Sequence, residues 1–322
     1  MLTLYDTTLR DGAQGLGVNF SLHDKLKITK ALDQLGVHYI EGGFPGSNPS
    51  DEEYFHAVKK VSLKKSVIVA FGSTARPWIA VGADLTLARL LAAETSHVTI
   101  FGKSSAVQVR DVLKTTLSEN LKVIHESVRF LTKRKRTVFY DAEHFFDGFL
   151  HNSSYALQTI HAAKDAGAAI IILCDTNGGM CPWQIEDIVE RVKSEVSIPL
   201  GIHSHNDSGV AVANSLYAIR AGCSQVHGTV NGFGERTGNA DLLTIIANIY
   251  LKMGIKVVSP SQLRQLTHVS RLICDVLNLP PMSEKPYVGE VAFAHKGGMH
   301  IDGVVKTGGY GFEHIDPALF GN

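Results

Sequence analysis

Residues 155–204 read YALQTIHAAKDAGAAIIILCDTNGGMCPWQIEDIVERVKSEVSIPLGIHS. A segment of helical length, Tyr155–Ala166, ends at Gly167 and leads into a short run rich in isoleucine, Ile170–Cys174. A second helical segment, Trp183–Val196, leads in the same way into Leu200–Ser204. Short runs of β-branched and apolar residues favour strands, whereas longer segments bounded by Gly and Pro favour helices. This stretch therefore predicts helices and strands in strict alternation.

The same alternation runs through the first 255 residues. The other predicted strands are Leu2–Asp6, Val37–Gly42, Val67–Phe71, His97–Phe101, Thr137–Asp141 and Gln225–Val230. The other predicted helices include Leu22–Leu35, Val107–Leu131, Val210–Ala221 and Leu242–Met253, and Gly36, Gly167 and Gly222 follow helices where a left-handed cap suits glycine. Eight strand-then-helix units in about 250 residues are typical of an α/β fold of the (β/α)8 barrel type. A doubly wound sheet is the alternative, and the lack of a GxGxxG motif after the first strand disfavours it.

The chain after the eighth unit reads differently. We predict a barrel over residues 1–257 and a C-terminal extension over residues 258–322. Ser261–Leu277 is predicted to form one more helix, and the stretch from Ser283 onward is rich in Gly and His, which favours loops or a lid. Pro317–Asn322 predicts no closing element, so the chain is expected to be part of a longer protein.

Composition narrows the function classes. The formal net charge of zero argues against a nucleic-acid-binding protein, because such binding depends on neutralising phosphates. No apolar run reaches the roughly 20 residues that cross a membrane, and no leader pattern precedes the first strand. The four cysteines form no CxxC pair, which indicates reduced thiols and a cytoplasmic protein.

Polar residues gather where the predicted strands end. The polar stretches are Asp6–Gln14, Glu41, Asp141–His144, Asp175–Asn177, His203–Asp207 and Asn231–Asn239. Catalytic groups of a (β/α)8 barrel lie at the carboxyl ends of its strands. The sequence therefore predicts an active site at this end of the barrel.

His203 and His205 are the sharpest local signal. Residues two apart on a strand project from the same face, and two imidazoles on one face can bind one divalent metal ion. The alternative is that one histidine packs against a neighbour while the other is solvated. Asp11 and Asn239 offer oxygen donors on the same rim and favour the metal site. Such a site keeps positions open for a substrate.

Three other polar residues each allow two interpretations. Arg10 can polarise a carbonyl or stabilise an enolate oxygen, or it can form a salt bridge with Glu41 that shapes the rim. Glu143 stands among aromatic residues that could raise its pKa for acid–base work, or it pairs with Arg10 or His144. Thr176 can bind a substrate carboxylate, or it caps the following turn.

Three motifs occur in order at the predicted strand ends: Asp6–Gly12 (DTTLRDG), His203–Asp207 (HSHND) and Gly232–Asn239 (GFGERTGN). Together they resemble the family of 2-isopropylmalate, homocitrate and citramalate synthases, within the wider group of metal-dependent condensing enzymes and lyases. The resemblance covers essentially the whole chain. It implies an acyltransferase that joins acetyl-CoA to a small 2-oxo acid.

Further stretches are most similar to the citramalate-forming branch of that family. They are Phe71–Thr74, Thr99–Ser104, Tyr140–Gly148, Leu173–Gly179 and Glu313–Pro317. This similarity implies pyruvate as the 2-oxo acid, citramalate and CoA as products, and isoleucine synthesis that is independent of threonine. A larger 2-oxo acid is the alternative. Phe101, Tyr140 and Phe145 lie near strand ends and either narrow the substrate pocket or pack in the core.

The resemblance also implies residue roles. The implied metal ligands, for Mg, Mn or Zn, are Asp11, His203, His205 and Asn239. Arg10 would stabilise the oxyanion, Glu143 would assist proton transfer and Thr176 would hold the substrate carboxylate. Gly232, Gly234 and Glu235 would lie near acetyl-CoA, and His300 would reach the site as a general acid or base.

The sequence departs from the family at two places. Ala13 replaces a common glutamate, and Phe312 replaces a common tyrosine, for which Tyr310 could substitute. Two rivals from the wider group fit less well. A hydroxymethylglutaryl-CoA lyase would carry a cysteine within Asn231–Asn239, and a carboxyltransferase would carry a lysine on the sixth strand. Family members form homodimers and carry a C-terminal allosteric domain, which this chain is expected to lack.

Overall fold

The computed structural model describes residues 1–309 and 311–322, and it contains a closed barrel of eight parallel strands in sequence order. The strands are β1 (Thr3–Asp6), β2 (Tyr39–Gly43), β3 (Val67–Ser73), β4 (His97–Lys103), β5 (Thr137–Glu143), β6 (Ile170–Asp175), β7 (Leu200–Ser204) and β8 (Gln225–Gly228). β8 pairs with β1 from Thr3↔Gln225 to Asp6↔Gly228, and this pairing closes the barrel. The predicted (β/α)8 barrel is confirmed.

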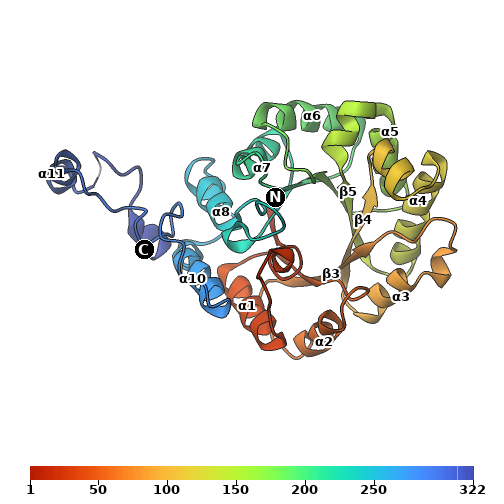
Figure 1. The fold of residues 1–322 in the computed structure, drawn as a ribbon, viewed down its shortest axis with the longest axis horizontal. Helices are drawn as coiled ribbons and strands as arrows, with labels where there is room; N and C mark the ends of the chain where they lie inside the picture. The colour runs from red at the N-terminus through yellow and green to blue at the C-terminus, as the bar shows by residue number, and fades with distance from the viewer. Residues whose placement is uncertain (310) are drawn as a thin grey trace.

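A helix follows each strand and packs around the outside of the barrel (Figure 1). These helices are α1 (Leu22–Leu35), α2 (Pro49–Val58), α3 (Leu85–Ala92), α4 (Leu117–Lys133), α5 (Phe145–Asp165), α6 (Pro182–Glu195), α7 (Ala211–Ala221) and α8 (Leu242–Leu251). The predicted glycine caps are confirmed, because Gly36, Gly167 and Gly222 have φ values of 89°, 99° and 116°. Only glycine adopts that left-handed conformation without strain.

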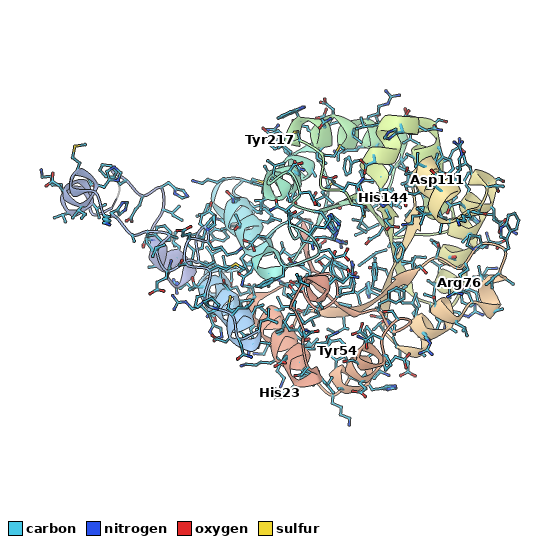
Figure 2. All side chains as sticks on the ribbon, viewed as in Figure 1. His23, Tyr54, Arg76, Asp111, His144 and Tyr217 are labelled. Carbon is cyan, nitrogen blue, oxygen red and sulfur yellow. The ribbon has the colours of Figure 1, made fainter. Side chains whose placement is uncertain are left out.

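The core has two layers, because alternate residues of each strand face opposite sides of the sheet. One layer lies between strands and helices and contains residues such as Tyr54, which is fully buried (Figure 2). The other fills the barrel interior with Tyr5, Val69, Phe139 and Ile172. Nearer the carboxyl ends of the strands, polar residues such as Asp141 and His203 line a cavity together with Phe71 and Phe101, so the packed interior forms the floor of the barrel mouth.

Three predicted helices are wrong in extent. α5 begins at Phe145, before the predicted start at Tyr155, and has a kink at Asn152. The other two are divided. In place of one helix over Val107–Leu131, a π-helical turn (η3, Gln108–Val112) precedes α4, and the side chain of Thr116 caps α4 by accepting the N–H of Glu119. In place of one helix over Ser261–Leu277, α9 (Pro260–Leu263) and α10 (Leu266–Val276) are separated where the N–H of Gln265 bonds back to Gln262. Local caps and turns override the apolar periodicity in both cases.

The C-terminal segment contains more regular structure than predicted. α11 (Gly298–Thr307) forms where loops were expected, and it projects away from the barrel (Figure 1). The prediction that Pro317–Asn322 closes nothing is wrong. A 3-10 helix (η5, Pro317–Phe320) buries Phe320 completely, with its ring 5.1 Å from that of Tyr287. Tyr310, named above as a substitute hydroxyl, lies outside the described residues.

Two expectations from composition can be compared with the structure. Within the described ranges, the helices are too short or too polar to cross a membrane. All four cysteines are free thiols, and Cys181 is the one that is not buried.

Candidate metal centre and active site

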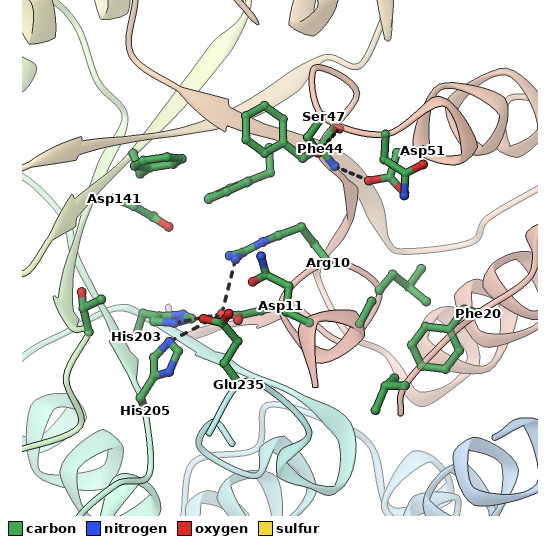
Figure 3. A pocket seen from close by; sticks show the side chains of 18 of the residues that line it. Arg10, Asp11, Phe20, Phe44, Ser47, Asp51, Asp141, His203, His205 and Glu235 are labelled. Carbon is green, nitrogen blue, oxygen red and sulfur yellow. Dashed lines mark hydrogen bonds and ion pairs between the residues drawn. The ribbon is translucent and has the colours of Figure 1, made fainter. Parts of the chain in front are cut away.

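The loop after β1 is shaped by the residues of its own motif. The carboxylate of Asp6 accepts hydrogen bonds from the backbone N–H and the hydroxyl of Thr8, at 3.0 and 2.7 Å. The hydroxyl of Thr8 in turn accepts the N–H of Val230 at 2.8 Å, which ties this loop to the segment after β8. The chain therefore turns sharply and directs Arg10 and Asp11 over the barrel mouth (Figure 3).

Asp11, His203 and His205 form one buried cluster. Oδ2 of Asp11 lies 3.2 Å from Nε2 of His203 and 3.8 Å from Nε2 of His205. The atoms of the three side chains that could bind a metal all lie within 4.8 Å of one another. Figure 3 shows the two imidazoles facing the carboxylate across the mouth. The predicted pair of histidines at the end of β7 thus lies together with a carboxylate from the loop after β1, two strands away around the closed barrel.

Electrostatics favour the metal-binding forms of Asp11 and His205, whereas the pKa of His203 is raised, because burial is outweighed by its interaction with Asp11. Burial acts to raise the pKa of Asp11, but Arg10 and the two histidines outweigh it and hold that pKa well below its usual range. Burial, followed by the neighbouring His203, lowers the pKa of His205 to about 4. An ionised carboxylate and a neutral imidazole are the forms that bind metals.

Asn239 lies beside His205 and is a candidate for a further ligand. Its backbone forms a β-bridge with His205, and its Nδ2 donates to the carbonyl oxygen of Phe233 at 3.2 Å. Its Oδ1 is buried and has no hydrogen-bond partner among the described residues. A buried amide oxygen without a partner is costly, unless a ligand completes its coordination. Two imidazoles, a carboxylate and this amide oxygen fit a divalent ion.

Arg10 is fixed from two sides. Its Nε donates to Oε1 of Glu41 at 2.6 Å, and its Nη1 lies 3.5 Å from Oδ2 of Asp11. Its guanidinium stacks 3.8 Å from the centre of the Phe71 ring. Glu41 is fully buried and also accepts the hydroxyl of Tyr5 at 2.5 Å. The predicted salt bridge with Glu41 is present, and it holds the guanidinium beside the metal cluster.

Glu143 and Thr176 have partners that the sequence did not indicate. Oε2 of Glu143 lies 2.7 Å from Nζ of Lys103, so its ion pair forms with Lys103, in place of the predicted Arg10 or His144. The hydroxyl of Thr176 accepts the N–H of His144 at 2.8 Å, which ties it to the loop after β5 instead of the turn after β6. This hydroxyl still has a proton to donate to a substrate.

The glycine-rich loop over Asn231–Asn239 is held against the mouth by Arg236. This residue belongs to the Gly232–Asn239 motif, but no individual role was predicted for it. Its guanidinium donates to both carboxylate oxygens of Asp207 at 2.8 Å and to the carbonyl oxygen of Thr176 at 3.0 Å, and it lies 3.1 Å from Nδ1 of His205. A Cβ on Gly238 would clash with the carbonyl oxygen of Gly232, so the loop requires glycine there.

These groups surround one cavity of about 450 Å³. Its lining includes Arg10, Asp11, Glu143, Thr176, His203, His205 and Glu235, together with Phe71, Phe101, Asp141 and Cys174. Of the three aromatic residues considered for narrowing the pocket, Phe101 lines it, whereas Tyr140 and Phe145 are fully buried in the outer core layer. Most of the predicted site residues therefore meet in one place.

His300 does not join them within one chain. It lies on α11, where its ring stacks on that of Phe312 with centroids 4.6 Å apart. α11 stands away from the barrel in Figure 1, so His300 is remote from its own barrel mouth. The sequence allowed this segment to reach the site from a partner subunit, and that prediction stays untested.

Comparisons with known proteins agree with this geometry. The family model described as HMGL-like matches residues 1–273. An (R)-citramalate synthase of Aquifex aeolicus is 51% identical over 320 residues, which is 99% of this chain and 60% of that protein. A 2-isopropylmalate synthase of Sulfolobus acidocaldarius is 36% identical over 320 residues, covering 99% of this chain and 79% of that protein.

Among solved structures, a hydroxymethylglutaryl-CoA lyase from Pseudomonas aeruginosa has the same fold, with a TM-score of 0.74 and 19% identity over 91% of this chain and 97% of that one. This chain spans about 60% of the length of the citramalate synthase that it matches. The family model covers far more than half of the chain, and the motif residues meet at one barrel mouth. The chain therefore belongs to the HMGL-like family.

Proposed function

We propose that this chain condenses acetyl-CoA with pyruvate to give (R)-citramalate and free CoA. The observation that carries the proposal is the buried Asp11–His203–His205 cluster with Arg10 fixed beside it. The similar proteins named (R)-citramalate synthase support the choice of substrates, because five of them are 45–51% identical to this chain. Proteins named 2-isopropylmalate synthase are less similar, at 33% and 36%.

In this proposal Asp11, His203, His205 and Asn239 hold a divalent ion, which acts as a Lewis acid toward the 2-oxo acid carbonyl when bound. Arg10 adds a fixed positive charge beside the oxygen that becomes an oxyanion. Because Glu41 and Phe71 already hold the guanidinium, little reorganisation is needed as that charge develops.

The remaining residues bind substrates and move protons. The hydroxyl of Thr176 donates to the carboxylate of pyruvate, while its own position is fixed by the N–H of His144. Gly232, Gly234 and Glu235 form the loop beside acetyl-CoA. Glu143, anchored by Lys103, assists removal of a proton from the acetyl methyl group. The methyl carbon then bonds to the keto carbon of pyruvate, and water cleaves the thioester to release CoA.

His300 enters this scheme only through a second copy of the chain. We propose a homodimer in which α11 of one subunit lies over the mouth of the other, so that His300 acts as a general acid or base there. Mixing the inactive variants Arg10→Ala and His300→Ala tests the arrangement. A symmetric exchange would restore about a quarter of the sites. If the mixture stayed inactive although mixed dimers formed, His300 would not act across the dimer.

The proposed reaction is tested by CoA release with four 2-oxo acids at equal concentration. Thiol release is measured with pyruvate, 2-oxobutyrate, 2-oxoisovalerate and 2-oxoglutarate, in the presence of Mg, Mn or Zn. We expect pyruvate to be fastest and 2-oxobutyrate to be a weaker second. Preference for 2-oxoisovalerate or 2-oxoglutarate would instead indicate 2-isopropylmalate or homocitrate synthesis, and no release with any acid would contradict the proposal.

A further inference from the structure

Asp141 is a buried carboxyl group that the proposed reaction does not yet use. On β5, alternate residues Phe139, Asp141 and Glu143 face the barrel interior. Asp141 lines the cavity at the barrel mouth. Only 4% of its surface is exposed, and its Oδ1 has no hydrogen-bond partner among the described residues. Figure 3 shows the carboxyl group directed toward the space in front of Arg10 and His203.

The charges around Asp141 are already balanced without it. Arg10 is paired with Glu41, and Lys103 with Glu143. The two positive charges of a divalent ion would be matched by Asp11 and by the carboxylate of a bound 2-oxo acid. An ionised Asp141 would therefore be an unmatched negative charge in a buried site, which is strongly unfavourable. The charge balance favours the neutral carboxyl group when substrate is bound.

The groups that face Asp141 come from several strands. The neighbouring β4 presents the apolar ring of Phe101, whose Cα is paired in register with that of Asp141. The titratable groups around it are Tyr5, Arg10, Asp11, Glu41, Glu143, Cys174 and His203. Burial first, and then Glu41, raise the pKa of Asp141, and these effects outweigh the opposing ones of His203 and Arg10.

A neutral carboxyl group has one O–H to donate, and every small 2-oxo acid offers acceptor oxygens. We propose that Asp141 contacts the bound 2-oxo acid directly, donating a hydrogen bond from its neutral carboxyl group to a substrate oxygen. This inference rests on the proposed function, because it requires an anionic 2-oxo acid in the cavity. It adds a substrate-binding residue to the site.

Two substitutions separate this role from its alternatives. Asp141→Asn keeps the shape and an N–H donor but cannot ionise, whereas Asp141→Ala removes the donor. Asp111→Asn, at an exposed position on the periphery (Figure 2), is the matched control. Pyruvate binding to each Mn-loaded protein is measured by titration calorimetry without acetyl-CoA, from pH 6 to pH 9, after the thermal transition has shown that each variant is folded.

We expect Asp141→Asn to bind pyruvate within a few-fold of wild type near neutral pH, and Asp141→Ala to bind about 10- to 100-fold more weakly, as for loss of a hydrogen bond to a charged group. Wild-type affinity should fall about tenfold per pH unit above the ionisation of Asp141, whereas that of Asp141→Asn should not.

Equal weakening in both variants, or normal binding by Asp141→Ala, would overturn the inference. Should Asp141→Ala not fold, a wild-type pH profile identical to that of Asp141→Asn would overturn it. A wild type that binds none of the four 2-oxo acids would instead refute the proposed function, and the inference with it.

Discussion

Glu41 is expected to be the residue on which the geometry of Arg10 depends, and Glu41→Gln tests this. The glutamate is fully buried and accepts Arg10 at 2.6 Å and Tyr5 at 2.5 Å. Removing one partner of a buried ion pair costs about 3–5 kcal/mol. Glutamine keeps the volume and one acceptor oxygen, and Asp11 remains as a counter-charge, so we expect about 3 kcal/mol. Tyr5→Phe removes the hydrogen bond to this charged acceptor and a second one, at 2.7 Å, with the hydroxyl of Thr99, so it should cost at least about 1.5–3 kcal/mol.

The two substitutions should also be coupled, because both act on the same carboxylate. Urea denaturation of the wild type, the two single variants and the double variant gives the coupling energy, which we expect to exceed about 1 kcal/mol. Glu190→Gln, an exposed change of the same kind on α6, should stay within about 0.5 kcal/mol of wild type. If Glu41→Gln behaved like this control, or if the double variant were simply additive, the proposed support of Arg10 by Glu41 and Tyr5 would be wrong.

Three further predictions concern the site and the fold. Arg10→Ala should lower turnover about 100- to 1000-fold with little change in pyruvate affinity, and a collapse of affinity with intact turnover would make Arg10 a binding residue. Chelation should abolish activity and lower the thermal midpoint, with recovery on adding Mg, Mn or Zn, whereas His205→Ala should show no metal-dependent shift. Asp33 accepts three backbone N–H groups, of Lys64, Lys65 and Ser66, and these lower its pKa against the effect of burial. Because the folded-state pKa is depressed, its contribution is present above the unfolded pKa of about 3.9 and is lost as pH falls. Asp33→Asn should therefore cost about 1–3 kcal/mol at pH 7 in urea denaturation, and a gap that did not narrow in acid would contradict this.

The barrel could be predicted because its signal repeats. Each strand is a short apolar run, and each helix is a longer segment with a cap. A chain of eight such units is compatible with few architectures other than a (β/α)8 barrel. Helix boundaries were less predictable. The side chain of Thr116 begins α4 later than apolar spacing suggested, and the turn at Gln265 divides α9 from α10. Such hydrogen bonds compete with helical periodicity over a single turn, which a pattern averaged over many residues does not detect.

The site was predictable at the level of strand ends and less so at the level of contacts. Alternation along β7 was sufficient to bring His203 and His205 to one face. No individual role was predicted for Lys103 or Arg236. Each contacts a partner that is far away in the sequence, Glu143 and Asp207 respectively, and local sequence patterns do not reveal such pairs. Arg236 has a positive φ of 56°, and this backbone conformation cannot be predicted from the residue type alone. Sequence thus predicted the residues proposed to bind metal and substrates, and the structure adds partners that hold them in place.

The exposure of α11 is a second argument for the proposed dimer, independent of catalysis. Every residue of this helix is exposed or half-buried, with Met299 82% and Val305 77% exposed. A helix of 10 residues is marginal in water without packing of an apolar face. The segments on either side of it are anchored, since Tyr287 and Phe320 pack together beside the barrel. In the proposed dimer, the barrel mouth of a second copy would cover Met299 and Val305 and would bring His300 to the cavity, so that dissociation of the dimer should destabilise α11.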